Sequence, residues 1–130
     1  MWWPCLWVAL GSALGGVGRF ALSIAIAERL GGLFPWATLI VNVTGSFVIG
    51  LFGTLTGPDG RFLAGDSARL FVMVGLCGGY TTFSAFSLQT LDLMRLGDWP
   101  RATGYIAASV ALCLLGVWLG HITAAAVNRW

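Results

Sequence analysis

Four long apolar stretches follow one another along the chain, and short polar segments separate them. They cover residues of about 4–27, 36–55, 68–91 and 102–127. A helix that crosses a bilayer needs roughly 20 mostly apolar residues, so each stretch is long enough to span a membrane. Tryptophans lie near the expected ends of the spans, where indole prefers the interface. The pattern predicts an all-α membrane protein in which residues 1–130 form a single domain of four transmembrane helices.

The third stretch carries glycines and polar residues at its centre. The run GGYTT at residues 78–82 interrupts the apolar sequence, and Phe83 and Phe86 follow on one face of the resumed helix. A backbone group that stays unpaired in lipid costs several kcal/mol. We therefore expect the third helix to be broken in mid-membrane, with the break facing protein, an ion or a wet cavity.

The composition agrees with a membrane protein. Hydrophobic residues make up 58% of the 130 residues and charged residues 9%, whereas soluble domains contain about 25% charged residues. The basic residues are all arginines and are scattered, which argues against a nucleic-acid interface. The three cysteines have no CxxC spacing and are interpreted as small apolar residues. We expect a multi-pass protein of the cell (inner) membrane, surrounded by the lipid bilayer.

The arginines give no preferred orientation across the membrane. An even number of spans places both termini and the middle loop on one side. The two sides carry equal sets, which are Arg61, Arg69 and Arg129 with the termini, and Arg29, Arg95 and Arg101 opposite. The positive-inside rule is therefore balanced. Either the signal is weak in a small protein, or the chain inserts in both orientations and forms an antiparallel dual-topology dimer.

Polar and small residues repeat every four positions along the second span, and this face includes Asn42. The fourth span carries a similar track with Tyr105, Ser109 and Cys113. Such stripes commonly serve helix packing in membranes. The amide and hydroxyl groups can also donate hydrogen bonds to an anion, and the spacing alone leaves both interpretations open.

The first span contains a glycine pair and a charge. Gly11 and Gly15 form a GxxxG motif, which predicts a close contact with another helix. Arg19 follows one turn later, and a charge within a span is costly unless it is paired or reaches the interface. Arg19 therefore either extends to the lipid headgroups or lines an anion vestibule.

No carboxylate lies at the centre of any span, because all acidic residues are at span ends or in loops. A proton-coupled or cation-carrying transporter normally needs a buried acid. The single histidine, His121, has no acid partner within the spans, so the chain offers an enzyme no catalytic group. The polar groups within the membrane are donors, which favours an anion as ligand.

Three motifs lie in the first three spans in a fixed order. They are GGVGR at residues 15–19, NVTGSF at 42–47 and GGYTTFSAFS at 78–87. Together they resemble the Fluc (CrcB) family of fluoride channels, and the chain length and number of spans agree with that family. The resemblance implies passive, selective export of fluoride, which relieves fluoride toxicity, by an antiparallel homodimer with two pores.

The resemblance also implies which residues form the site. The fluoride pore is expected to be lined by Phe83, Phe86, Asn42, Ser109, Tyr105, Thr82 and Arg19. A central structural sodium ion (Na⁺) is expected to be held by the backbone carbonyls of Gly78 and Thr81 from both subunits.

Three positions depart from the family pattern. Gln89 stands where a glutamate is common, Cys113 replaces a hydroxyl residue, and Tyr80 replaces an apolar residue. Two other classes of protein are considered. A small multidrug-type transporter would need a carboxylate inside the first span, which this chain lacks. A non-transporting membrane partner protein would explain the small-residue stripes but not a broken third helix.

Overall fold

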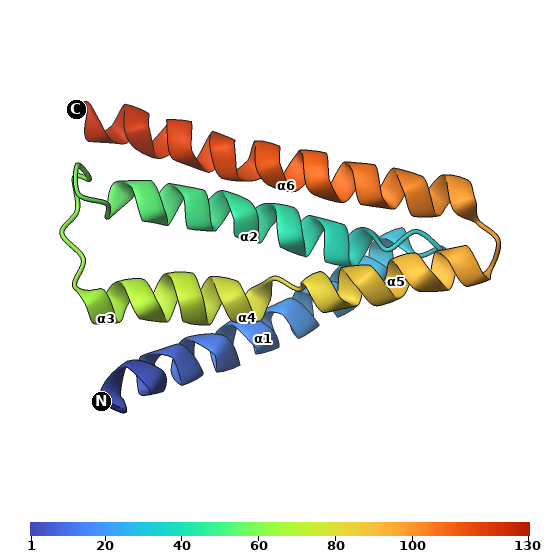
Figure 1. Ribbon diagram of the computed structural model, residues 1–130, viewed down its shortest axis with the longest axis horizontal. Coiled ribbons are helices and arrows are strands. Elements are labelled where there is room, and N and C mark those ends of the chain that lie inside the picture. Colours follow the sequence, from blue (N-terminus) through green and yellow to red (C-terminus); the bar gives the residue numbers. More distant parts are fainter.

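The computed structural model describes all 130 residues, and they form four long helices, the third of which is interrupted (Figure 1). The uninterrupted helices are α1 (Trp3–Leu30), α2 (Trp36–Leu55) and α6 (Trp99–Asn128). The third consists of α3 (Asp66–Arg69), the π-helix η1 (Leu70–Cys77), α4 (Gly78–Tyr80) and α5 (Phe83–Arg95). All four are long and apolar enough to cross a membrane, which confirms the predicted spans. The bounds of α2 are as predicted, and the other three helices extend a few residues further at their ends.

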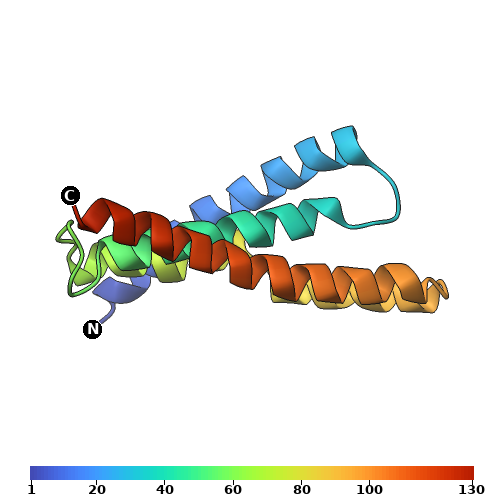
Figure 2. The same ribbon diagram turned by 90° about the horizontal axis from the view of Figure 1, so that it is seen from above.

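The helices pack mainly as two pairs, α2 with α6 and α1 with the third helix. In Figure 1, α2 lies between α6 and the third helix, and α1 crosses behind the third helix. Figure 2 shows the C-terminal half of α1 leaning away from α5 and α6. The helix α1 therefore packs against η1 and α4 of the third helix and leaves α5 uncovered.

Glycines allow α1 to approach the third helix closely. A Cβ atom on Gly11 would overlap the carbonyl oxygen of Phe71, and one on Gly15 would overlap that of Leu76. From the facing side, a Cβ atom on Gly79 would lie 2.6 Å from the carbonyl oxygen of Ser12. The helix contact predicted from the GxxxG motif is therefore confirmed.

The helix break falls on two threonines. Thr81 (φ −82°, ψ 157°) and Thr82 (φ −151°, ψ 115°) are both extended. Gly78 and Gly79 remain helical in α4, so the interruption occupies only the end of the predicted segment 78–82. Gly79 serves the close packing against α1 instead. The sequence pattern did not predict the π-helix that precedes α4.

Candidate functional site

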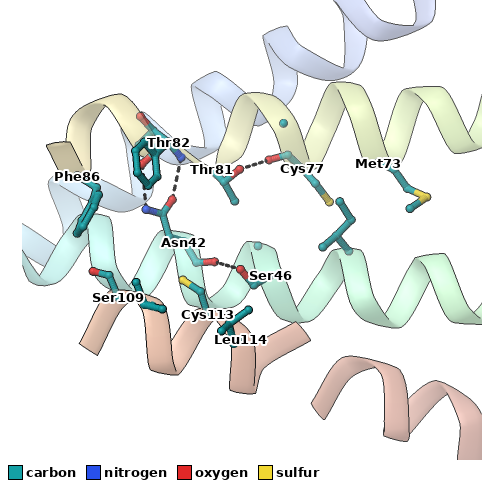
Figure 3. Close-up of a pocket in the computed structure, with 15 residues that line it drawn as sticks. Asn42, Ser46, Met73, Cys77, Thr81, Thr82, Phe86, Ser109, Cys113 and Leu114 are labelled. Carbon is teal, nitrogen blue, oxygen red and sulfur yellow. Dashed lines mark hydrogen bonds between the residues drawn. The ribbon is translucent and has the colours of Figure 1, made fainter. Parts of the chain in front are cut away.

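A cavity of about 410 Å³ lies beside the helix break, between α2, the third helix and α6 (Figure 3). Its polar lining includes Asn42, Ser46, Thr81, Thr82 and Ser109. Its apolar lining includes both phenylalanines of α5, Cys77, and side chains that sequence analysis did not single out: Ile49, Met73, Val110 and Leu114. These residues were missed because their apolar character does not distinguish them from lipid-facing positions. No carboxylate lines the cavity.

The side chain of Asn42 pairs with the backbone of the break. Its Oδ1 accepts the N–H of Thr82 at 2.7 Å, and its Nδ2 donates to the carbonyl oxygen of Thr82 at 3.0 Å (Figure 3). The two bonds replace helix partners that a broken helix cannot supply. Because an amide NH₂ has two donors, one N–H of Asn42 is left for a further acceptor in the cavity.

Residues of α2 also contact Tyr80 and Thr81, the two residues that precede Thr82. The hydroxyl of Thr44 lies 2.9 Å from the hydroxyl of Tyr80. A Cβ atom on Gly45 would overlap the side-chain methyl of Thr81, so the threonine fits closely against α2 at this glycine. Three consecutive residues of the third helix thus contact one short segment of α2.

The break also ends one helix and begins the next through its own side chains. The hydroxyl of Thr81 donates to the carbonyl oxygen of Cys77 at 2.9 Å (Figure 3). The hydroxyl of Thr82 caps α5 by accepting the N–H of Ala85 at 3.1 Å. Thr82 is an N-cap of the preferred type, because its oxygen satisfies a backbone donor that has no partner within the helix.

Phe83 and Phe86 line the cavity from the first turn of α5. Their ring centroids lie 5.3 Å apart, with an angle of 51° between the planes. Phe83 is 78% exposed on the surface of this chain, whereas Phe86 packs against Tyr105 with the ring centroids 5.0 Å apart. The edge of an aromatic ring carries positive partial charge, which suits contact with an anion.

The two predicted pore residues of α6 occupy different places. Ser109 is buried and lines the cavity. Tyr105 is fully buried behind Phe86, in the core cluster with Leu39 and Leu93, and is not among the lining residues. Its hydroxyl donates to Oε1 of Gln89 at 2.8 Å. The amide at this departure from the family pattern therefore accepts the tyrosine hydrogen bond.

Arg19 lies apart from the cavity lining. Its Nε is buried and has no hydrogen-bond partner in this chain. A guanidinium group with an unpaired donor within a span calls for a partner from elsewhere. Sequence analysis identified the charge, but the residues of this chain do not connect it to the other site residues.

The chain was compared with known proteins. Residues 6–121 match the family model described as "CrcB-like protein, Camphor Resistance (CrcB)". A protein of Methylocella silvestris named "Fluoride-specific ion channel FluC" is 63% identical over 124 residues, which is 95% of each chain. Proteins of the same name from Opitutus terrae and Paramagnetospirillum magneticum are 61% and 60% identical, over 95% and 94% of this chain and 93% and 95% of theirs. With the matched region covering most of its length, this chain belongs to the CrcB family.

Proposed function

We propose that this protein is a fluoride channel, which lets fluoride leave the cell passively and relieves fluoride toxicity. The observation that carries the proposal is the cavity at the helix break, where hydrogen-bond donors and phenylalanine rings converge and no carboxylate is present. The relatives named as fluoride-specific channels support the same ion. The chemistry is transport alone, and no bond is made or broken.

The selectivity for fluoride follows from what the cavity offers an anion. A small anion gives up much of its hydration on entry, and closely spaced donors replace the lost water. The free N–H of Asn42 and the hydroxyls of Thr82 and Ser109 are these donors. The rings of Phe83 and Phe86 contribute their edges. Tyr105 supports Phe86 from behind, and Arg19 attracts anions toward the pore.

The functional unit is an antiparallel homodimer with two pores, each lined by both subunits. Phe83 supports this assembly, because it is an aromatic ring of the cavity wall that is 78% exposed in a single chain. A second copy would close the open side of the cavity at this ring. The equal numbers of arginines on the two sides agree with insertion in both orientations.

A structural sodium ion at the centre of the dimer is part of the proposal. No group of three or more His, Cys, Asp or Glu side chains is placed to hold a metal ion, so the ligands would be backbone oxygens. The carbonyls of Gly78 and Thr81 fit this requirement, because they lie at the interruption and hard cations take oxygen ligands. The positive charge would favour anions nearby.

The proposed function is tested by efflux from liposomes that contain the purified protein. A fluoride electrode measures fluoride loss, and a chloride electrode measures chloride loss from matched vesicles. We expect rapid loss of fluoride with retention of chloride. If dimeric protein releases neither ion, the fluoride channel is contradicted and a non-transporting partner protein is favoured. Exchange of a cationic drug for protons would instead identify a small multidrug-type transporter.

The orientation is tested separately with a single cysteine added at the C-terminus. Cys5 is exposed and is replaced by serine to lower the background. Equal labelling of the tag from both membrane faces is expected for dual topology. Labelling from one face alone contradicts it.

A further inference from the structure

We propose that Asn42 and the hydroxyl of Thr82 are positioning groups, which keep the backbone carbonyls of Gly78 and Thr81 free for a cation. Each group takes up a backbone N–H that would otherwise bond to one of these carbonyls. The inference rests on the sodium site of the proposed function. It assigns to Asn42 a role beyond that of a donor to fluoride.

The first step concerns the carbonyl of Gly78. In a continuous α-helix, the N–H of each residue bonds to the carbonyl four positions earlier. The N–H of Thr82 would therefore bond to the carbonyl of Gly78. It is instead committed to Oδ1 of Asn42 at 2.7 Å, so the Gly78 carbonyl loses its usual donor.

The second step concerns the carbonyl of Thr81. Its usual donor is the N–H of Ala85, four positions later. That N–H is committed to the hydroxyl oxygen of Thr82 at 3.1 Å. The Thr82 hydroxyl is thus the N-cap of α5 and, by the same bond, leaves the Thr81 carbonyl without its helix partner.

The third step concerns selection among the oxygens of the break. The carbonyl of Thr82 accepts a hydrogen bond from Nδ2 of Asn42 at 3.0 Å, and the carbonyl of Cys77 accepts the N–H and the hydroxyl of Thr81, both at 2.9 Å. Gly78 and Thr81, by contrast, are two residues whose usual helix donors, the N–H groups of Thr82 and Ala85, are bonded to side-chain oxygens instead. Nothing lies within 4 Å of the position where a Cβ atom on Gly78 would stand, so no other segment of this chain packs against that side of Gly78.

As a consequence, the side chain of Asn42 serves two purposes. One end of the Asn42 amide fixes the break and thereby frees a carbonyl for a cation. The remaining N–H of Asn42, a residue that lines the cavity, is left as a donor. Substituting Asn42 should therefore disturb the cation site as well as the anion path.

The experiment observes the Thr82 amide directly. Thr81-Thr82 is the only pair of adjacent threonines in the chain. Labelling threonine with both ¹³C-carbonyl and ¹⁵N therefore gives a single HNCO resonance, which belongs to the amide of Thr82. The exchange rate of this amide with solvent is measured in nanodiscs, and the sodium dependence of the melting temperature is measured on the same full-length protein.

Three variants separate the roles. In Asn42→Ala the side-chain acceptor is lost, so we expect the Thr82 resonance to move and its exchange to become about tenfold faster, which corresponds to one net hydrogen bond. Stabilisation by sodium should be lost at the same time. In Asn42→Asp the acceptor for the Thr82 N–H is kept and only the donor to the Thr82 carbonyl is lost, so this amide should stay protected and sodium should still stabilise the protein. Fluoride efflux by Asn42→Asp should nevertheless fail, because a carboxylate repels the anion.

Ser46→Ala is the matched control for the Thr82 resonance. Ser46 lines the same cavity, and its hydroxyl donates only to the backbone carbonyl of Asn42 at 2.7 Å. We expect its Thr82 resonance and sodium response to equal those of the wild type. An unchanged resonance in Asn42→Ala, or an unchanged sodium response in that variant, would overturn the inference. If the melting temperature of the wild type does not change with sodium, the proposed cation site is wrong. This holds even if the Thr82 amide responds to Asn42→Ala and fluoride still flows.

Discussion

Phe83 and Phe86 face the same cavity with their ring centroids 5.3 Å apart, yet only Phe86 is anchored within this chain. Phe86 packs against Tyr105, whereas Phe83 is 78% exposed. A large apolar side chain at the surface of a cavity wall contributes little to the fold of one chain. Its ring is therefore free to contact a ligand or another chain, and the two phenylalanines can be tested independently.

We expect Phe83→Ile to abolish fluoride efflux without unfolding the protein. Isoleucine keeps the apolar character of the position but removes the ring edge that we propose contacts the anion. Efflux from liposomes gives the flux, and size-exclusion chromatography gives the oligomeric state. Phe62→Ile in the exposed loop between α2 and α3 is the control and should conduct normally. Wild-type flux in Phe83→Ile would remove this ring from the pore.

We expect Gly15→Ala to destabilise the protein by about 1–3 kcal/mol, which is typical of overpacking. The added methyl group would overlap the carbonyl oxygen of Leu76 in the adjoining π-helix. Gly16→Ala is the neighbouring control, because nothing lies within 4 Å of the corresponding position. It should be neutral or slightly stabilising, since alanine favours a helix over glycine by about 1 kcal/mol. Denaturant titration of both variants gives the free energies of unfolding, and equal losses would contradict a close α1 contact specific to Gly15.

We expect Tyr105→Phe to lower the free energy of unfolding by about 1 kcal/mol, the net value of a hydrogen bond. The change removes the donor to Oε1 of Gln89 and keeps the ring behind Phe86. Tyr80→Phe is the control for a lost tyrosine hydroxyl. It should cost less, because the Thr44 hydroxyl keeps its bond to the carbonyl oxygen of Ile40 at 2.8 Å. Thermal unfolding of both variants decides the order, and a larger loss in Tyr80→Phe would reverse the assignment.

We expect the start of α6 to weaken in acid. The hydrogen bond from the Arg101 side chain holds the pKa of Asp98 below its usual range, and Asp98 also caps α6 through the N–H of Arg101. A carboxyl whose pKa is lower in the folded state stabilises the protein above its unfolded pKa of about 3.9. That stabilisation is lost as the pH falls from this value through the lower folded pKa. Asp98→Asn cannot titrate, so its melting temperature should change less between pH 5 and pH 3 than that of the wild type. These two pH values lie about one unit above and below the unfolded pKa.

The membrane architecture was determined by the sequence itself. The length of each apolar stretch is a local property, and lipid admits only helices at that length. The interruption of the third helix was also evident, because polar residues at 78–82 lie in mid-span. The family motifs at residues 42–47 and 78–87 identified the two segments that meet at the cavity.

The tertiary structure alone decided how these segments are joined. The bonds between Asn42 and Thr82 connect residues 40 positions apart. The spacing of residues along one helix does not tell at which depth in the membrane the residues of a neighbouring helix lie. For the same reason the sequence placed Tyr105 with Ser109 on one polar track, while the packing of Phe86 puts a ring between Tyr105 and the cavity. The exact place of the break is likewise a tertiary result. Gly79 stays helical because α1 packs against it, and the threonines become extended because α2 supplies partners for their backbone and side chains.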